Sequence, residues 1–337
     1  MGIRIAVDAM GGDHAPCATV RGAVGALNDS PNLRVTLVGD ESRISRELDN
    51  FEVCAVRDRI GIVHATQVVA MDEPPVEAIK NKRDSSLTRM VELAASGEVD
   101  AVLSAGNTGA CAAACQLRLR PLACVSRPGI AVAIPSFYGP FVLCDVGANI
   151  QAKPRHLYEY AVMASLYAQR VLGIDRPRVA MLSIGEESGK GTGLIREAHA
   201  LLSADPTLNF VGNAEGRELF LNRCDVAVCD GFVGNIVLKF VEGLAEGLFA
   251  TIEREFEGEQ TQLKERFCRG LDAVRQRHDY SRYGGAPLLG INGVCIICHG
   301  RSNEVAVCNA VKAAGRFVEQ RFVEAITQRL GKTVSAA

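Results

Sequence analysis

The chain has 337 residues, of which 48% are hydrophobic and 23% charged, and its formal net charge is −2 at pH 7. This is the composition of a globular protein with ample length for a core, and the absence of any block of Lys and Arg argues against a general nucleic-acid binder. Tryptophan is absent and aromatic residues make up only 5%, so the sequence offers no platform for stacking bases or sugars.

The first residues predict a buried strand at 3–7 that runs into a glycine turn. The turn contains, in order, Gly11, Gly12, Asp13, His14 and Pro16. Paired glycines let the backbone approach a ligand, and a proline is suited to open a helix whose N-terminus attracts anions. The turn also carries an acid and an imidazole. We therefore expect an anion site that could also take part in chemistry.

Nine further apolar runs predict strands along the chain, with patterns of period 3.6 between most of them. They cover residues 34–38, 61–64, 101–104, 129–134, 141–146, 178–182, 209–212, 226–229 and 294–298. Continuous apolar strands separated by helices are typical of a parallel sheet that is covered on both faces. The sequence therefore predicts an α/β fold, read as a single α/β domain over residues 1–337.

One insertion, at about residues 236–281, lacks any strand signal and predicts a helical hairpin that projects from the α/β body. Its turn is expected near residues 257–261. Two core-packing or dimer-forming helices are the favoured interpretation. The alternative is an element that touches a membrane, because apolar residues gather toward the tip, namely Leu248, Phe249 and Phe256. Four acidic residues weaken that alternative for an anionic bilayer: Glu253, Glu255, Glu257 and Glu259.

Polar or glycine-rich turns follow five of the later strands. Their polar and glycine residues include Asn107, Thr108, Asn149, Lys190, Gly234, Asn235 and His299. Any one such turn is more often a plain connection between elements. Ligands in open α/β sheets bind at the carboxyl ends of the strands, so the series together predicts one polar crevice for a small oxyanion such as phosphate.

Several other sequence patterns resemble known nucleotide, hydrolase, haem or zinc motifs but do not predict such a site. The glycines at 185–191 do not have P-loop spacing, and no G-x-S-x-G elbow is present. Cys295 to His299 matches C-x-x-C-H, but these cysteines are expected in a buried strand, which argues against haem and against a redox pair. Zinc is disfavoured because no second ligand pair stands at the right spacing and Cys111 and Cys115 sit in an Ala-rich helix. We expect no metal and no cofactor.

The 12 cysteines are scattered through apolar strands and helices, where a free thiol packs as a small hydrophobe. No signal peptide is recognisable and no apolar run of about 18 residues exists. A cytoplasmic location with reduced cysteines is therefore expected.

With these motifs in order, the chain resembles the PlsX family, bacterial acyl-ACP:phosphate acyltransferases of phospholipid synthesis. The resemblance runs from Ile5 to about Arg329, nearly the whole chain. It depends on eight motifs in fixed order, at residues 7–16, 72–74 with 84–86, 104–110, 145–149, 212–217, 230–235, 284–290 and 299–300. Two positions depart from the family pattern, Ser183 where Asn is usual and Pro75 where another small residue is usual.

The resemblance implies a Rossmann-like α/β/α sandwich related to phosphotransacetylase and the isocitrate dehydrogenase group. It implies attack of inorganic phosphate on the thioester of acyl-ACP, which gives acyl phosphate and free acyl carrier protein. It also implies a homodimer built partly by the hairpin. Peripheral contact with the inner face of the membrane, and transfer of the acyl phosphate to a membrane glycerol-phosphate acyltransferase, are left open. The alternatives are a phosphotransacetylase that uses acyl-CoA and a membrane-docking scaffold without catalysis.

The expected site residues follow from the family motifs and from the polar strand ends. Lys190 and Asn235 are expected to contact phosphate and the oxyanion, and Asp13 and His14 to orient phosphate or protonate the departing sulfur. The remaining expected binding residues are Gly11, Gly12, Asn107, Thr108, Asn149, Gly234 and His299. Such a site would act by holding phosphate in line and by stabilising the tetrahedral oxyanion with fixed donors.

Overall fold

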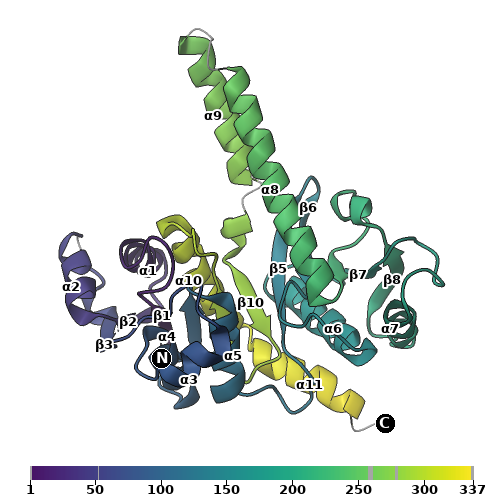
Figure 1. Ribbon diagram of the computed structural model, residues 1–337, viewed down its shortest axis with the longest axis horizontal. Helices are drawn as coiled ribbons and strands as arrows, with labels where there is room; N and C mark the ends of the chain where they lie inside the picture. The colour runs from purple at the N-terminus through teal and green to yellow at the C-terminus, as the bar shows by residue number, and fades with distance from the viewer. Residues whose placement is uncertain (1, 52, 257–260, 278–279, 335–337) are drawn as a thin grey trace.

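The computed structural model describes residues 2–51, 53–256, 261–277 and 280–334. A single sheet of 11 strands forms its centre, and helices cover both faces of the sheet (Figure 1). The strands are β1 (Ile3–Asp8), β2 (Leu33–Gly39), β3 (Ile60–His64), β4 (Ala101–Ser104), β5 (Gly129–Ser136), β6 (Gly139–Cys144), β7 (Arg178–Leu182), β8 (Asn209–Ala214), β9 (Val226–Val228), β10 (Ala286–Leu289) and β11 (Val294–Ile297). They lie in the order β3-β2-β1-β4-β11-β10-β5-β6-β9-β7-β8.

Two apolar cores lie on opposite faces of this sheet, because successive side chains of a strand point to opposite sides. The first core is completed by α1 (Cys17–Asp29), α2 (Glu41–Asp49), α6 (Pro154–Arg170), α7 (Gly193–Ser203), α10 (Glu304–Glu319) and α11 (Phe322–Val334). The second is completed by α3 (Pro75–Asn81), α4 (Ser86–Ala95), α5 (Thr108–Arg118) and part of α8 (Gly231–Glu255). This is the expected α/β/α sandwich. Three short 3-10 helices connect elements: η1 (Arg57–Arg59), η2 (Gly216–Phe220) and η3 (Tyr280–Tyr283).

The sequence identified ten of the strands and missed β10. That strand is four residues long, contains Pro287, and stands between the glycines Gly285 and Gly290. Glycine and proline at this density indicate a turn rather than a strand. Since all eleven strands form one sheet, the reading of the chain as a single domain remains reasonable and stays a prediction.

The expectation of a purely parallel sheet is wrong at its centre. β3, β2, β1, β4 and β11 are parallel to one another, and so are β6, β9, β7 and β8. Between the two groups, β10 pairs antiparallel with β11 and β5, and β5 pairs antiparallel with β6. The two parallel groups therefore run in opposite directions, and their carboxyl ends lie at opposite edges of the sheet.

The shortness of β10 brings these two edges close together. At one end of β10, Ala286 pairs with Ile297, the last residue of β11. Leu288, two residues further, pairs with Ile130, whose carbonyl accepts a hydrogen bond from Val146 just after β6. Two strand residues span only about 7 Å. The turns that follow β4, β11 and β6 can therefore border the same cavity although their strands run in opposite directions.

The hairpin is present as α8 and α9 (Thr261–Arg277), and it projects from the body of the molecule (Figure 1). α8 begins on the sheet, where the carboxylate of Asp230 caps it by accepting from Phe232 and Val233. Further along, the rings of Phe256 and Phe267 stack with centroids 3.5 Å apart and hold the two helices together. Most of the predicted turn, at residues 257–260, lies outside the described residues.

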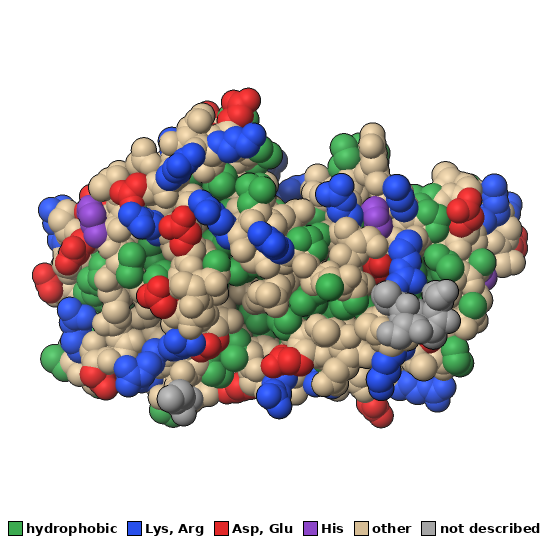
Figure 2. Space-filling model, turned by 90° about the horizontal axis from the view of Figure 1, so that it is seen from below, with side chains coloured by type: hydrophobic (Ala, Val, Ile, Leu, Met, Phe, Trp, Pro, Cys, Tyr) green, Lys and Arg blue, Asp and Glu red, His purple; other side chains and the backbone are tan. Residues whose placement is uncertain are grey.

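Two features of the described residues concern membranes and charged partners. Within the described ranges, no helix combines the length and apolar character needed to cross a bilayer. On the face seen in Figure 2, Lys and Arg side chains are interspersed with Asp and Glu side chains rather than gathered into one basic patch.

Candidate active site

A cavity of about 470 Å³ lies between α5 and α8, over the middle of the sheet. Its floor contains Ile130 and Val132 of β5, and its wall includes the first residues of α3 and α5. Three of the residues expected from the sequence line it: Thr108, Asn235 and His299. Thr108 and Gly109 are the first two residues of α5, so the positive end of that helix is presented to the cavity.

Asn107 fixes the beginning of α5 and is fully engaged in doing so. Its side-chain carbonyl accepts a hydrogen bond from the N–H of Ala110 as an N-cap. Its amide group donates to the carbonyls of Ala70, Met71 and Glu73 at 2.9–3.2 Å. Asn107 therefore positions the helix start and the 70–73 loop, and is not itself a lining residue of the cavity.

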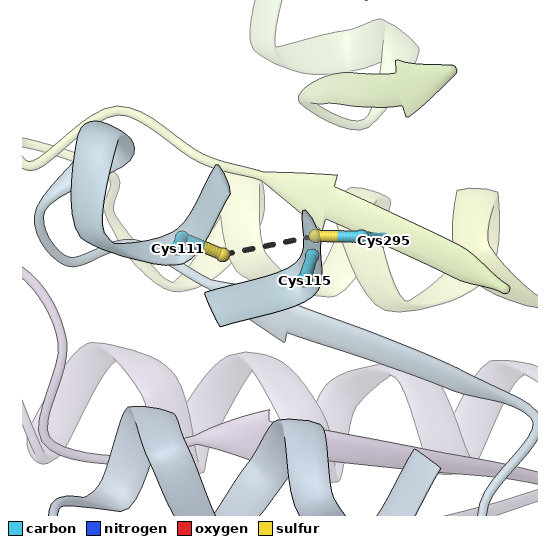
Figure 3. Close-up of side chains that lie close together, drawn as sticks. All are labelled: Cys111, Cys115 and Cys295. Carbon is cyan, nitrogen blue, oxygen red and sulfur yellow. Dashed lines mark hydrogen bonds between the residues drawn. The ribbon is translucent and has the colours of Figure 1, made fainter. Parts of the chain in front are cut away.

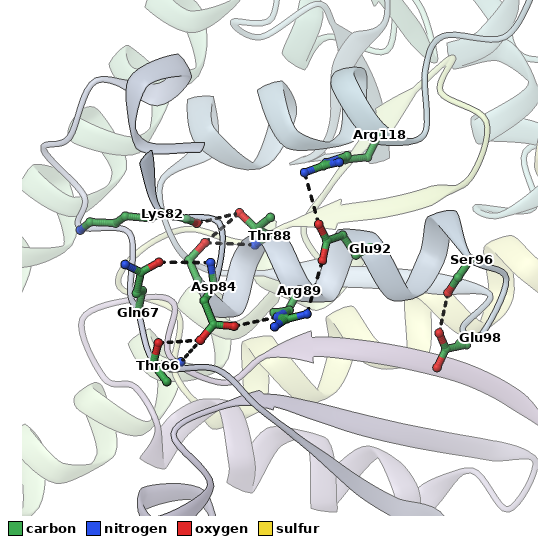
Figure 4. A network of polar contacts seen from close by, with 11 residues as sticks. Thr66, Gln67, Lys82, Asp84, Thr88, Arg89, Glu92, Ser96, Glu98 and Arg118 are labelled. Carbon is green, nitrogen blue, oxygen red and sulfur yellow. Dashed lines mark hydrogen bonds and ion pairs between the residues drawn. The ribbon is translucent and has the colours of Figure 1, made fainter. Parts of the chain in front are cut away.

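A polar network holds the segment that leads into α3 (Figure 4). The carboxylate of Asp84 accepts from both the hydroxyl and the N–H of Thr66 and pairs with Arg89 at 2.7 Å. These hydrogen bonds lower the pKa of Asp84 to about 2, with that from the Thr66 hydroxyl contributing most. The side chain of Glu92 continues the network to Arg118 of α5 at 3.2 Å. The loop at Thr66 is thereby tied to α4, and α4 to α5.

The opening glycine turn packs against the turns that follow β4 and β11. A Cβ on Gly11 would lie 2.7 Å from the backbone nitrogen of Gly106, and Gly12 has a φ of +98°. The N–H of Asp13 donates to the carbonyl of Gly300 at 2.8 Å. The motif thus supports the turn that carries His299. His14 is exposed and does not line the cavity.

Asp8, the last residue of β1, lies under this junction with only 2% of its surface exposed. Its carboxyl group accepts from the hydroxyl of Ser104 at 2.7 Å and from the N–H of Met10 at 3.2 Å. Burial raises the pKa of Asp8, and the hydrogen bonds from Ser86 and Ser104 offset only part of that increase. The side chain ties the turns after β1 and β4 into one unit.

Asp145 plays the corresponding part at the end of β6. Its buried carboxylate accepts backbone hydrogen bonds from Ile130, Gly147, Ala148 and Asn149 at 2.7–3.1 Å. Burial raises the pKa of Asp145, against the four N–H donors, which lower it. Gly147 and Ala148 line the cavity, so this carboxylate shapes one of its walls.

Asn149 points away from the cavity that it was expected to line. Its amide nitrogen donates at 2.6 Å to both the carbonyl of Pro128 and the hydroxyl of Tyr160. Both N–H donors of the amide are therefore used inside the protein. The backbone carbonyl of Asn149 accepts from Gly231, which ties this turn to the start of α8.

The strongest functional geometry in the cavity involves His299 and Lys239. Nδ1 of His299 accepts from the N–H of Arg301 at 3.2 Å, so the neutral ring carries its proton on Nε2. Nε2 lies 3.4 Å from Nζ of Lys239, and an ammonium group is also a donor. Two N–H donors therefore lie side by side at the cavity, and a single anion could accept from both.

Lys239 was missed by the sequence analysis. It interrupts the apolar face of α8 between Leu238 and Phe240, and that interruption was the available signal. One ammonium N–H is held by Glu242 one turn later, at 2.8 Å. The other N–H donors of the ammonium remain available to a ligand. Asn235, one turn earlier on α8, lines the same wall with an exposed side chain.

Lys190 lies on the exposed loop between β7 and α7 and is not among the lining residues of this cavity. Its aliphatic stem packs over Gly185, where a Cβ would lie 3.0 Å from Cγ of the lysine. Beside the loop, Oγ of Ser183 and Oδ1 of Asn213 are buried without a hydrogen-bond partner among the described residues. Two oxygen atoms beside the loop can therefore still accept hydrogen bonds. A role for Lys190 stays a prediction.

A second cavity, of about 800 Å³, adjoins the first along α8. The two share four lining residues: Leu238, Lys239, Glu242 and His299. The second cavity extends between the β5–β6 hairpin and the α8–α9 hairpin, and much of its lining is apolar, including Ile134, Pro135, Phe137, Phe220, Val241 and Phe249. A polar centre thus opens into a long apolar groove.

Comparison with known proteins gives one consistent group of relatives. The family described as "Fatty acid synthesis protein" matches residues 3–325. The phosphate acyltransferases of Desulforamulus reducens and Heliobacterium modesticaldum are each 46% identical to this chain. They match over 329 and 330 residues, which is 97% of this chain in both cases and 97% and 98% of the relatives. That of Brevibacillus brevis is 46% identical over 333 residues, or 98% of both chains.

The fold has matches among solved structures. A phosphotransacetylase from Streptococcus pyogenes superposes with a TM-score of 0.63 at 18% identity, covering 94% of both chains. A phosphotransacetylase from Staphylococcus aureus gives a TM-score of 0.61 at 15% identity, also over 94% of both chains. At these identities the likeness concerns the fold alone, and it confirms the expected phosphotransacetylase-like fold.

Proposed function

This chain belongs to the fatty acid synthesis protein family, and on that premise we propose that it transfers a fatty acyl group from acyl carrier protein to inorganic phosphate. Acyl transfer to phosphate is the chain's activity, as in relatives that are 46% identical over nearly its full length. The carrier protein as donor, and supply of the product to phospholipid synthesis, are the proposed parts.

One observation carries the proposal: Nε2 of His299 and Nζ of Lys239 lie 3.4 Å apart at the cavity, where one anion could accept from both. Phosphate is anionic near neutral pH, so no strong base is needed to activate it as a nucleophile. An ammonium group, an imidazole N–H and the start of α5 can bind such an anion. Holding it beside a thioester lowers the entropy cost of attack. Asn235 lies on the same wall, and its amide can donate to the tetrahedral oxyanion.

The reaction makes few further demands on the protein. A phosphate oxygen forms a bond to the thioester carbon, the carbon–sulfur bond then breaks, and the sulfur leaves as a thiolate that takes up a proton. Because a thiolate is a good leaving group, no strong general acid is needed. The donors at the cavity therefore supply most of what the chemistry requires.

The second cavity supports a long acyl chain as the transferred group. It adjoins the polar centre at Lys239 and His299, and apolar side chains line much of its length. Its volume lies within the range of about 300–1,000 Å³ that is usual for ligand sites. An acyl chain in this groove would place its thioester carbonyl beside the proposed phosphate position.

The proposal is tested by incubating the purified protein with phosphate and either acyl-ACP or acyl-CoA, and by trapping acyl phosphate with hydroxylamine. We expect hydroxamate from acyl-ACP that depends on both phosphate and protein. Product from neither donor would contradict acyl transfer to phosphate. Product from acyl-CoA alone would leave that activity in place and overturn the carrier protein as donor.

We further propose that the exposed apolar stripe on α8 binds a second copy of the chain. The stripe consists of Ile236, Phe240, Leu244 and Leu248, whose exposed fractions are 53%, 67%, 59% and 57%. These residues recur every four positions, so they follow one another along the helix surface. Isolated exposed leucines are ordinary, but a continuous row of this length indicates an interface.

Peripheral membrane contact has less support. Of the three residues expected at the hairpin tip, Phe256 stacks on Phe267 and Phe249 lies under the guanidinium of Arg275, so both are engaged within the hairpin. Leu248 alone of the three is strongly exposed. A second chain is therefore the better occupant of the stripe. Contact with the inner membrane and hand-off of acyl phosphate to a glycerol-phosphate acyltransferase remain proposals that follow from the product's chemistry.

A further inference from the structure

Three buried cysteines meet between α5 and β11 (Figure 3). Cys111 and Cys115 lie one turn apart on α5, and Cys295 comes from β11, which the helix covers. The three Sγ atoms lie within 4.8 Å of one another, and those of Cys111 and Cys295 are 3.7 Å apart. The sequence alone does not bring the strand cysteine to the helix pair, because Cys295 follows Cys115 by 180 positions.

The spacing suits a single thiophilic atom bound by all three sulfurs. Bonds from such an atom to sulfur are about 2.3 Å long, so three sulfurs that share it lie about 3.4 Å apart around a pyramidal centre and about 4 Å apart around a planar one. No fourth His, Cys, Asp or Glu among the described residues joins the group. A tetrahedral structural zinc site would therefore be incomplete here, whereas a three-coordinate site would be complete.

Charge selects among the thiophilic elements. The three cysteines are 0–1% exposed and belong to an apolar core with neighbours such as Ala112, Ala114 and Leu119. The buried carboxyl group of Asp8 interacts electrostatically with Cys111, so negative charge on the sulfurs would also be repelled. Three thiolates leave a site with a charge of −2 around a monovalent ion and −1 around a divalent ion. Only a trivalent centre leaves the filled site neutral, as an apolar interior requires.

We propose that Cys111, Cys115 and Cys295 form a binding site for a trivalent thiophilic element, with arsenic(III) as arsenite the ligand that matches its geometry and charge. Arsenous acid would exchange its three hydroxyl groups for the three thiols. Three arsenic–sulfur bonds form, three arsenic–oxygen and three sulfur–hydrogen bonds break, and three water molecules leave. No electrons are transferred, so the step needs no oxidant or reductant.

Occupancy would join two elements that build the proposed active site. The residues of α5 that line the cavity include Thr108, Gly109 and Ala112, and β11 runs directly into Cys298 and His299. An atom bound to sulfurs of both elements would fix the helix relative to the strand from behind the cavity wall. Binding at the three cysteines could therefore change the position of the cavity wall, although the bound atom would lie outside the cavity.

The experiment titrates the full-length folded protein with sodium arsenite and follows it by native mass spectrometry and thermal melting. We expect one tightly held arsenic per chain, with a mass gain of one arsenic less three hydrogens, and a raised melting temperature. Cys295→Ala and Cys111→Ala should each abolish both effects. Cys224→Ala removes a buried thiol outside the trio and should leave both effects intact.

Absence of arsenic from the wild-type protein, or its retention by Cys295→Ala, would overturn the proposal. A bound arsenic that keeps a hydroxyl group would also overturn it, because only two sulfurs would then be bonded. If Cys295→Ala does not fold, Cys115→Ala offers the same test at a position already surrounded by alanines in α5.

Discussion

Gly234 packs so closely on Asp145 that a Cβ at this glycine would overlap the carbonyl oxygen of the aspartate. The contact sets the first turn of α8, which carries Asn235, against the turn that follows β6. We expect Gly234→Ala to destabilise the protein by about 1–3 kcal/mol, because backbone atoms on both sides must move. Urea unfolding measures the change.

Gly270→Ala on α9 is the matched control for this variant, because nothing lies within 4 Å of a Cβ at that glycine. Alanine there should stabilise the helix by up to about 1 kcal/mol. Equal effects of the two substitutions would show that the Gly234 contact is not as close as described.

Replacement of Lys239 tests the proposed phosphate position. Lys239→Met keeps the apolar stem and removes the charge, so we expect the KM for phosphate to rise about 10- to 100-fold, as for loss of a charge-assisted hydrogen bond. Initial rates at varied phosphate and fixed acyl donor give this value. Lys332→Met, an exposed lysine of α11, is the control. A KM unchanged in Lys239→Met would remove this lysine from the site.

Lys190 is expected, together with Asn235, to contact phosphate and the oxyanion, and a separate variant tests it. Lys190→Ala is expected to lower turnover at saturating phosphate, whereas loss of Lys239 should be seen mainly in the KM for phosphate. Full kinetic curves in both substrates separate the two. Unchanged turnover at saturating phosphate would show that Lys190 is not a catalytic residue. The proposed site would then consist of the first cavity alone.

The proposed dimer is tested on the exposed stripe of α8. Phe240→Glu places a charge at the most exposed residue of the stripe, where burial against a partner would be costly, so we expect a shift from dimer to monomer. Sedimentation equilibrium measures the masses. Val305→Glu changes another exposed apolar residue, on α10 and 58% exposed, and should leave the dimer intact. A wild-type monomer, or a dimeric Phe240→Glu, would contradict the interface.

Acid stability should depend on Asp84. Its pKa is lowered to about 2 by hydrogen bonds from Thr66 and Arg89, so its contribution to stability is fully present above the unfolded value of about 4 and is lost as the pH falls through 2. Asp84→Asn is therefore expected to flatten the decline in melting temperature between about pH 4 and pH 2. Asp175→Asn, at an exposed loop position, is the control. Parallel declines in Asp84→Asn and the wild type would contradict this.

The sequence was sufficient to predict ten of the eleven strands and part of the candidate site. Apolar runs predict strands well because buried strands leave little choice of residue, and β1, β4 and β7 lie where expected. β10 could not be recognised, because its strand character comes from the partners on each side rather than from its own residues. Missing it also concealed the reversal of direction between the two halves of the sheet.

The same limit explains the residues that were misplaced or missed. Asn107 and Asn149 follow strands, as ligand-binding residues often do, but their amides are consumed by backbone carbonyls and Tyr160. Which partner an amide finds depends on segments far away in the chain. Lys239 became visible as a site residue only once α8 was placed beside the turn of His299.

β10 is held to each neighbouring strand by only two residue pairs, whereas β5 and β6 share six. The two halves of the molecule are therefore joined along their narrowest seam directly beneath the cavity. Because α5 follows a strand of one half and α8 a strand of the other, a twist at that seam would change the separation of these two helices.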